Sequence, residues 1–295
     1  MKLVSHFVSG ELRAGLLVDS SIYPLDEWIA AQPVPGFPVA GGGLLRLLQA
    51  GPGALRDLRL VAQSPQQLGA SIPVSDAVLL APVPRPGKIV IVGRNYREHA
   101  DEIGGSAAAR PRLLAKFPSS TRGHGAIIGR PSGVEKLDYE GELAVVIGSR
   151  ATHVSIDVAL GHVAGYTVLN DLTAREFQFD MAPPQTSFAK SMDGFAPMGP
   201  WLVTSDEVAD PQSLFIRTWV NAELRQQAST ASMLLGVADL ISYISRFTVL
   251  EPGDVVATGT PAGCGAFAKP PRYLQPGDQV RIEITGVGVL ENTIG

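Results

Sequence analysis

The sequence contains little cysteine, no clustered charge and no long apolar run. Cys264 is the single cysteine among 295 residues, so an internal disulfide is excluded. The net charge is −4 without any block of like charges, and the basic stripe typical of nucleic-acid-binding proteins is missing. The apolar runs have the length of strands and are cut by charged residues, glycine or proline, which argues against a membrane span.

Several well-known signatures are missing as well. The opening segment MKLVSHFVSGELRAG has neither the apolar region nor the cleavage site of a signal peptide. Together with the single cysteine, this predicts a cytoplasmic protein that binds neither membrane nor nucleic acid. There is no G-x-G-x-x-G and no phosphate-binding loop ending in Gly-Lys-Ser/Thr. The absence of a G-x-S-x-G elbow argues against a serine hydrolase.

Glycine and proline, by contrast, are abundant. The 32 glycines and 23 prolines are spread between apolar runs, a distribution typical of many turns and short strands rather than of disorder. Three prolines fall within APVPRPGK, and because proline fixes φ and disfavours helix in the preceding residue, this stretch is expected to be extended. We therefore predict a small N-terminal domain (1–80), a linker (81–87) and a larger domain (88–295).

The periodicity of apolar residues predicts a chain rich in strands. Helices are expected near 25–31 and 44–49, a helical turn over 95–103, and one amphipathic helix over 233–245. The expected strands are 2–8, 13–25, 88–93, 139–148, 162–170, 200–205, 214–221, 254–260 and 279–286. The related segments L-E-P-G-D and L-Q-P-G-D, at 250–254 and 274–278, indicate one type of turn used twice.

An acidic cluster gives the strongest local signal. Asp138, Glu140 and Glu142 alternate, and in a strand such residues share one face at a spacing of ~7 Å. The LAVVIG that follows is apolar on both faces, so this strand is expected to enter the core, where unpaired carboxylates are costly. Asp171 ends the predicted strand GYTVLND and is the expected third ligand of a cation. An all-oxygen set favours Mg²⁺, Mn²⁺ or Ca²⁺. A solvated face of an edge strand is an equally good interpretation of the alternating acids.

Two further patterns suggest acid–base and anion-binding chemistry. His99 and Glu102 are three residues apart, so on a helix their side chains can meet, and the carboxylate can then fix the tautomer of a histidine base. The alternative is a surface histidine beside helix charges. Lys190 lies among small and apolar residues, where a partly buried ammonium needs an anionic partner; the alternative is a surface lysine whose stem lies along apolar neighbours.

The segments DLTAREFQ and GTPAGCG offer weaker candidates. If the first segment is helical, Asp171, Arg175 and Gln178 share a face, and Arg175 can clamp a substrate carboxylate or form an internal ion pair. In the second, backbone N–H groups and the Thr260 hydroxyl can hold an anion, although a plain turn is the simpler interpretation. Cys264 fits a packed small residue better than a nucleophile.

These motifs occur in an order that resembles the fumarylacetoacetate hydrolase family. The resemblance covers 88–295 and rests on V-G-R-N-Y-x-x-H-x-x-E, D-Y-E-G-E-L-A-V-V-I-G, G-Y-T-x-x-N-D-L-T-A-R-x-x-Q, A-K-S-M-D, P-x-G-P-W and L-x-P-G-D-V-V-A-T-G-T-P. It implies a β-rich α+β fold with a rolled, mixed sheet, a small N-terminal α/β domain and usually a homodimer. Residues 192, 222 and 264 (Met, Ala and Cys) depart from the family's common residues.

The resemblance also implies the roles of individual residues. Mg²⁺ or Mn²⁺ is held by Glu140, Glu142 and Asp171, and a His99–Glu102 pair lies on a lid that orders over the substrate. Lys190 is expected to stabilise the charge of the reacting substrate. The other residues expected to bind the substrate or make the pocket positive are Arg94, Lys116, Arg175, Gln178 and Thr260.

The expected substrate is a small anionic 2-oxo or 1,3-dioxo acid, and the first hypothesis is a hydrolase that cleaves a C–C bond of an acylpyruvate. A decarboxylase acting on oxaloacetate or a related keto acid, and an isomerase or hydratase, are alternatives that use the same residues. A non-catalytic binding protein is a third class, which the intact set of metal and His–Glu residues disfavours. The lid around 104–111 is expected to select the substrate.

Overall fold

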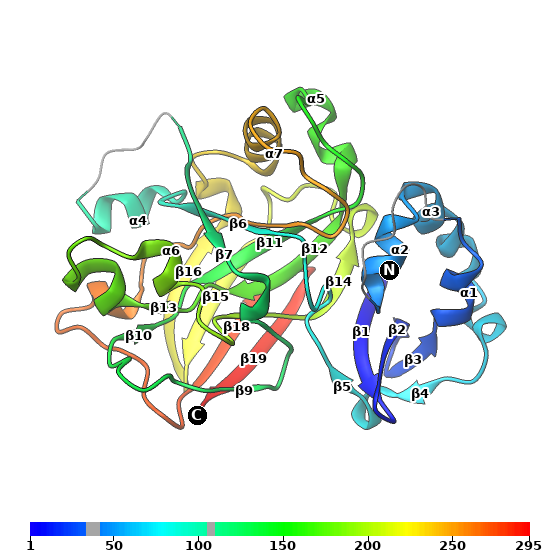
Figure 1. Ribbon diagram of the computed structural model, residues 1–295, viewed down its shortest axis with the longest axis horizontal. Helices are drawn as coiled ribbons and strands as arrows, with labels where there is room; N and C mark the ends of the chain where they lie inside the picture. Colours follow the sequence, from blue (N-terminus) through cyan, green and yellow to red (C-terminus); the bar gives the residue numbers. More distant parts are fainter. Residues whose placement is uncertain (34–41, 105–109) are drawn as a thin grey trace.

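The computed structural model describes residues 1–33, 42–104 and 110–295, and most of its strands belong to two sheets that pack together (Figure 1). The strands of the larger sheet are β1 (Lys2–Val8), β2 (Glu11–Val18), β3 (Ser21–Pro24), β4 (Ile72–Pro73), β5 (Val78–Leu79), β6 (Ile89–Gly93), β7 (Arg112–Lys116), β8 (Thr121–Arg122), β11 (Gly141–Ile147), β12 (Val163–Asn170), β14 (Ala196–Thr204) and β17 (Val255–Ala257).

The larger sheet has 12 strands, ordered β4-β3-β2-β1-β14-β12-β11-β17-β6-β7, with β5 paired to β1 and β8 paired to β14. It contains both parallel pairs, such as β17 with β6, and antiparallel pairs, such as β11 with β12. The expected mixed, β-rich α+β architecture is confirmed. The first strand of the chain, β1, pairs with β14 in the register Leu3 opposite Leu202, so residues from both sides of the predicted linker share this sheet.

The second sheet has five strands, ordered β16-β15-β18-β19-β9, and contacts β11, β12 and β14 of the first. Its members are β9 (Ile127–Ile128), β15 (Phe215–Val220), β16 (Glu223–Ser229), β18 (Gln279–Ile284) and β19 (Gly288–Ile294). A separate pair consists of β10 (Leu137–Asp138) and β13 (Thr173–Ala174).

The helices are short. They are α1 (Asp26–Ala30), α2 (Leu44–Gln49), α3 (Pro52–Val61), α4 (Arg97–Glu102), α5 (Ile156–Ala159), α6 (Thr186–Ala189) and α7 (Val237–Ser245). The 3-10 turns are η1 (Pro65–Leu68), η2 (Val74–Asp76), η3 (Pro118–Ser120), η4 (Leu160–His162), η6 (Ser205–Glu207), η7 (Thr230–Ser232) and η8 (Gly265–Phe267), and η5 (Glu176–Asp180) is a π-helical turn. No helix in the described ranges is long and apolar enough to cross a membrane.

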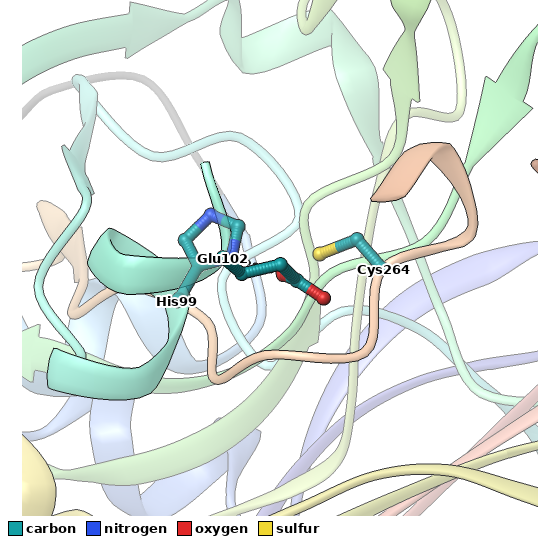
Figure 2. Close-up of side chains that lie close together, drawn as sticks. All are labelled: His99, Glu102 and Cys264. Atoms are coloured by element: carbon teal, nitrogen blue, oxygen red, sulfur yellow. Dashed lines mark hydrogen bonds and ion pairs between the residues drawn. The ribbon is translucent and has the colours of Figure 1, made fainter. Parts of the chain in front are cut away.

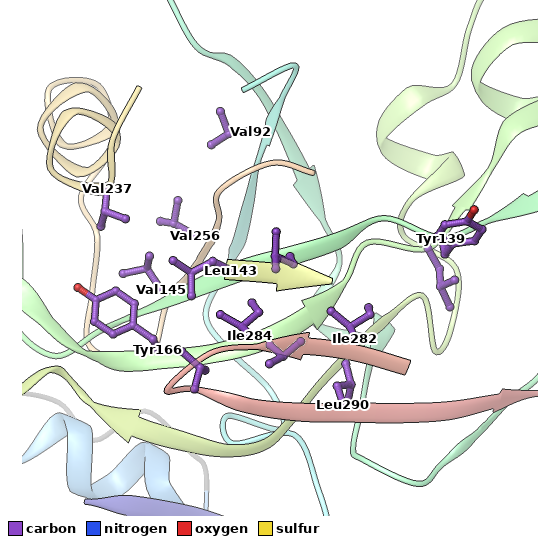
Figure 3. Close-up of a cluster of buried hydrophobic side chains, with 14 of the residues drawn as sticks. Val92, Tyr139, Leu143, Val145, Tyr166, Val237, Val256, Ile282, Ile284 and Leu290 are labelled. Carbon is purple, nitrogen blue, oxygen red and sulfur yellow. The ribbon is translucent and has the colours of Figure 1, made fainter. Parts of the chain in front are cut away.

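Strand β11 is buried on both faces, as the uninterrupted apolar run LAVVIG predicts. On one face, Leu143 and Val145 belong to the core between the two sheets, together with side chains of β18 and β19 (Figure 3). On the other face, Ala144 and Val146 belong to a second core, to which α1, α2 and α3 also contribute. The strand that carries Glu142 is therefore fixed from both sides.

Several expectations about elements need correction. The expected strand 13–25 is in fact two strands, β2 and β3, separated by a turn at Asp19 and Ser20. The predicted helix 233–245 begins only at Val237, because the backbone N–H groups of Leu234 and Leu235 bond instead to the carbonyl and side chain of Asn95. Helix α3 was not predicted. The division at 81–87 stays a prediction; the chain there has no helix, as its prolines suggest.

Candidate active site and metal centre

The candidate site lies at one edge of the larger sheet, where three strands end and a fourth begins. Strand β11 is antiparallel to β12 and β17, and β17 is parallel to β6. The carboxyl ends of β6, β12 and β17 therefore meet the amino end of β11. Each of these ends carries a part of the site, which brings together segments that are far apart in the sequence.

The three predicted metal ligands meet at this edge. Oxygen atoms of Glu140, Glu142 and Asp171 lie within 4.8 Å of one another, and all three residues are buried, so a solvated strand face is excluded. The backbone N–H of Asp171 donates to the Glu140 carbonyl at 2.8 Å, which fixes the two segments together. Residues 171, 140 and 142 thus form one buried cluster of carboxylates.

Asp138 does not join this cluster, although the alternation places it on the same strand face. The strand is interrupted at Tyr139 and Glu140, between β10 and β11. The Asp138 carboxylate instead accepts hydrogen bonds from the Arg175 Nε at 2.9 Å and from the backbone N–H groups of Gly265 and Ala266. Because of this interruption, the strand expected over 139–148 begins only at Gly141.

Three cationic side chains neutralise most of the buried carboxylates. Lys190 Nζ lies 3.0 Å from Glu140 Oε2 and 2.5 Å from Asp171 Oδ2, and Lys116 Nζ lies 2.5 Å from Asp171 Oδ1. Arg175 pairs with Glu140 at 2.7 Å. Burial raises the pKa of Glu140, but Lys190 and Arg175 outweigh burial and hold that pKa below its usual value. Burial lowers the pKa of Lys116 to about 8, although Asp171 opposes this shift.

Glu142 is the exception, because no cationic side chain of the described residues pairs with it. Its Oε2 accepts one hydrogen bond, from the backbone N–H of Gly259 at 2.8 Å. Burial, together with the nearby charges of Asp171 and Glu140, raises the pKa of this carboxyl well above its usual value. A buried carboxylate without a counter-charge, beside two others, fits a hard divalent cation such as Mg²⁺ or Mn²⁺ held by Glu140, Glu142 and Asp171.

The predicted acid–base pair is also present. His99 and Glu102 lie on α4, with His99 Nδ1 3.0 Å from Glu102 Oε2, so the other ring nitrogen, Nε2, remains for proton transfer. His99 is buried, with 6% of its surface exposed, and its ring packs edge-on against Phe267 at 5.6 Å between centroids. The surface alternative is therefore wrong.

Backbone contacts hold this helix in place. The Asn95 amide donates to the carbonyls of Thr258 and Leu235, and its oxygen accepts from the Leu235 N–H. At the other end, the Gly263 N–H donates to Glu102 Oε1 at 3.1 Å. The expected lid segment 104–111 lies largely outside the described residues, at 105–109.

One cavity, with a volume of about 160 Å³, is lined by parts of both the carboxylate cluster and the acid–base pair, but Asp171, Glu102 and Lys116 are not among its lining residues. The predicted site residues that line this cavity are Arg94, His99, Glu140, Glu142, Arg175, Gln178, Lys190 and Thr260. The sequence reasoning missed Arg112, Leu114, Phe179 and Phe267, which line the same cavity. The signal for Arg112 was its alternation with Leu114 and Lys116, which share one face of β7.

The weaker candidates have mixed outcomes. Arg175 and Gln178 are hydrogen-bonded at 2.8 Å, but Asp171 does not share a helix with them, because 173–174 form β13 and the helical turn begins at Glu176. The Arg175 guanidinium forms internal ion pairs with Asp138 and Glu140. The Thr260 hydroxyl lines the cavity but donates to the Gly141 carbonyl.

The glycine-rich turn 259–265 does bind anions, and these are carboxylates of the protein itself. The N–H groups of Gly259, Gly263 and Gly265 donate to Glu142, Glu102 and Asp138, respectively. Gly259 and Gly263 have φ of +102° and +105°, and a Cβ on Gly263 would lie 2.0 Å from the Arg225 carbonyl oxygen. Glycine is thus required here to orient the carboxylates of Glu142 and Glu102.

Comparison with known proteins indicates a single family for this chain. A model of the C-terminal domain of fumarylacetoacetate hydrolase matches residues 88–295. The oxaloacetate tautomerase YisK of Bacillus subtilis is 43% identical over 226 residues, which are 75% of this chain and 74% of that protein.

Solved structures resemble the whole chain. The fumarylacetoacetate hydrolase of Exiguobacterium antarcticum is 36% identical, with a TM-score of 0.80 over 100% of this chain and 99% of that one. The maleylpyruvate hydrolase of Sphingobium sp. SYK-6, in complex with manganese(II) and pyruvate, is 28% identical, with a TM-score of 0.78 over 100% of this chain and 98% of that one.

Proposed function

The chain belongs to the fumarylacetoacetate hydrolase family, and from this premise we propose that it is an Mg²⁺- or Mn²⁺-dependent hydrolase that cleaves a C–C bond in a small acylpyruvate-type diketo acid. One observation carries the proposal. His99, held by Glu102, lines the same cavity as Glu140, Glu142 and Lys190, so a base, two metal ligands and an ammonium act on one bound molecule.

The charges of the site support an anionic substrate. Glu140 and Asp171 already have cationic partners, so a divalent ion beside Glu142 leaves the cavity positive. Arg94 and Arg112 line the cavity and form no ion pair with any carboxylate of the described residues. Guanidinium groups bind carboxylates bidentately, so these two residues are the proposed contacts for the substrate's carboxylates.

The chain's own residues would perform the following steps. His99, oriented by Glu102, takes a proton from water, and the hydroxide adds to the carbonyl farther from the substrate's carboxylate. The C–C bond between this carbonyl carbon and the CH₂ group next to it then breaks, and its electron pair remains on the pyruvate fragment as an enolate. Lys190 stabilises this negative charge, and the proton held by His99 passes to the CH₂ carbon, which completes pyruvate and restores the base. When bound, Mg²⁺ or Mn²⁺ would supply Lewis-acid polarisation of the keto group.

A second candidate is keto–enol tautomerisation of an oxaloacetate-type acid, favoured by the 43% identity to a relative named as an oxaloacetate tautomerase. This reaction needs only a base that moves a proton between carbon and oxygen, and His99 can do this without a water molecule. Hydrolysis and tautomerisation thus share the same residues but differ in their products. We also propose a cytoplasmic location and a homodimer.

The test is a panel of acylpyruvates and oxaloacetate, assayed with metal-stripped protein to which Mg²⁺ or Mn²⁺ is returned. Hydrolysis gives pyruvate and a second acid from acylpyruvates. Tautomerisation changes the enol absorbance of oxaloacetate without releasing pyruvate, and decarboxylation of oxaloacetate releases both pyruvate and CO₂. Turnover that persists in excess EDTA would contradict the metal requirement.

Two histidine variants test whether His99 has a specific role in turnover. His99→Ala should keep the metal bound and lower turnover by about 10²–10⁴-fold. His153→Asn is the control, because His153 is exposed and lies outside the cavity, and asparagine tolerates its φ of +52°. Equal activity of the two variants would exclude His99 as the base.

A further inference from the structure

A sulfur atom lies beside the acid–base pair. Cys264 follows Gly263, whose N–H holds Glu102, and its Sγ points toward the Glu102 carboxylate (Figure 2). One ligand atom each of Cys264, His99 and Glu102 lies within 4.8 Å of the others. Cys264 has no part in the proposed reaction, although it is buried against the two residues that drive it.

The chemistry of this cluster differs from that of the carboxylate cluster. Thiolate, imidazole and carboxylate are the usual ligands of Zn²⁺, whereas Mg²⁺ prefers oxygen alone. The set Glu140, Glu142 and Asp171 contains only oxygen, and the set Cys264, His99 and Glu102 contains sulfur, nitrogen and oxygen. The two clusters should therefore select different metals, even in the presence of both.

We propose that Cys264, His99 and Glu102 form a second metal site, which takes a thiophilic divalent cation such as Zn²⁺ and thereby switches the enzyme off. The binding part of this proposal stands on the cluster alone. The inhibition part rests on the proposed function, because it requires His99 to be the base.

The geometry needs only a small adjustment. Zn²⁺ binds sulfur at about 2.3 Å and nitrogen or oxygen at about 2.0–2.2 Å, so tetrahedral ligand atoms lie about 3.5 Å apart. Closing the present separations requires shifts of about 1 Å, which the side chains of the short helix α4 can supply. Glu102 is the most exposed of the three, with 21% of its side chain accessible, and offers the path of entry.

Binding would remove the base directly. The thiol proton of Cys264 leaves to solvent and a metal–sulfur bond forms, with no change in oxidation state. A His99 ring nitrogen and a Glu102 oxygen bond to the metal in place of their mutual hydrogen bond at 3.0 Å. With Nδ1 bound to the metal, the ring proton of His99 lies on Nε2, so this nitrogen has no lone pair to take a proton from water, and the ring has lost the carboxylate that orients it. The hard metal at Glu140, Glu142 and Asp171 would remain in place.

Cobalt(II) reports on this site without any assay of activity. With saturating Mg²⁺ present, Co²⁺ should bind the wild-type protein and give the near-ultraviolet thiolate-to-cobalt charge-transfer band, together with the visible spectrum of a tetrahedral ion. Cys264 is the single cysteine, so the band can arise nowhere else within the chain. Zn²⁺ should abolish the band by displacement. A wild-type protein without the band would overturn the proposal.

Matched variants identify the ligands. Cys264→Ala should lose the band, and Glu102→Gln should weaken Co²⁺ and Zn²⁺ binding, whereas Glu98→Gln, which removes a carboxylate from the same helix, should bind as the wild type does. Glu140→Gln should keep the band, since it alters only the oxygen cluster. Loss of the band in Glu140→Gln, or equal weakening in Glu98→Gln and Glu102→Gln, would contradict this assignment.

Inhibition is measured as the ratio of turnover with and without Zn²⁺ for each variant, at saturating Mg²⁺. Altering an outer-shell partner of a metal site costs 10–100-fold in affinity, so losing the direct ligand Cys264 should raise the Zn²⁺ concentration for half inhibition by about 100-fold. Unchanged inhibition in Cys264→Ala would overturn the proposal. If no substrate of the panel is turned over, the proposed function fails, while the cobalt band still decides on the site.

Discussion

At the scale of single residues, the carboxylates of the site differ in how their charge is balanced. Asp171 has two lysine partners and Glu140 has Lys190 and Arg175, but Glu142 has only the N–H of Gly259. An uncompensated buried charge destabilises the folded state by the cost of its desolvation. We therefore expect metal binding and stability to be most tightly coupled at Glu142.

Glu142→Gln should have opposite effects with and without metal. In excess EDTA the variant should be as stable as the wild type or more stable, because it removes the unpaired charge. With Mg²⁺ at about 100 times its Kd, the wild type should gain about 2.7 kcal/mol, and the variant should gain much less. Thermal unfolding with EDTA and with Mg²⁺ measures both effects. An Mg²⁺-induced rise in Tm equal to that of the wild type would show that Glu142 is not a ligand.

The sequence predicted the carboxylates and the His–Glu pair of the site, but not how the charged residues are paired. Glu140, Glu142, Asp171, His99 and Glu102 were found because each lies in a recognisable local pattern. The pairing of Asp138 with Arg175 was not found, because it depends on a break in the strand at Tyr139 and Glu140 that the acidic alternation conceals. Pairings of this kind are fixed by tertiary contacts, which no local spacing encodes.

At the scale of elements, one turn occurs twice in different surroundings. In both 251–254 and 275–278 the N–H of the aspartate bonds to the first residue's carbonyl, and the aspartate side chain accepts that residue's N–H. The glycines have φ of +89° and +91°. Asp254 is buried, and its carboxylate also binds the backbone N–H and the side chain of Lys88. Asp278 is only half-buried, and its carboxylate also accepts a hydrogen bond from the Asn221 side chain.

This pair allows a matched comparison. Asp254→Ala should lower the free energy of unfolding by about 2–4 kcal/mol, because it breaks charge-assisted hydrogen bonds and leaves the N–H groups of Lys88 and Glu251 unsatisfied in a partly buried place. Asp278→Ala removes the same turn contact at the surface and should cost about 1 kcal/mol. Urea unfolding measures the difference. Equal losses would mean that the turn, and not its burial, determines the cost.

Turns of this kind could be predicted from sequence because their hydrogen bonds are local. The start of α7 could not, since its apolar pattern continues backward to Met233, while the N–H groups of Leu234 and Leu235 bond to Asn95, far away in the chain. Tertiary hydrogen bonds thus replaced the first helical turn. The same contacts position α4, so the error fell at a segment that supports the site.

At the scale of the whole molecule, the segment 123–126 is attached to β19 of the smaller sheet. The Asn292 side chain donates to the carbonyls of Gly123 and Ala126, and His124 Nδ1 accepts the N–H of Glu291 at 3.1 Å. Burial lowers the pKa of His124, with Glu291 opposing the shift. Burial likewise lowers the pKa of His6, in β1.

These shifts predict that acid weakens the fold. Because the pKa is depressed in the folded state, the unfolded chain takes up the proton first as pH falls below about 6.5, and stability is lost as pH falls through the folded-state pKa. His124→Gln keeps an acceptor for Glu291 but does not titrate. Between pH 7.5 and 5.5 it should lose less stability than the wild type, by at most about 1.4 kcal/mol per pH unit.

Urea unfolding at several pH values tests this expectation, with His153→Asn as a control that should follow the wild type. A steeper pH dependence in His124→Gln than in the wild type would contradict it.

The pairing of β1 with β14 has a consequence for the order of events during synthesis. Leu3 lies opposite Leu202, so about 200 residues separate the two partners. At translation rates of 5–20 residues per second, β14 would leave the ribosome roughly 10–40 s after β1. During that time the edge of β1 that later meets β14 is open to other strands, and a chaperone that shields it would raise the yield of folded protein.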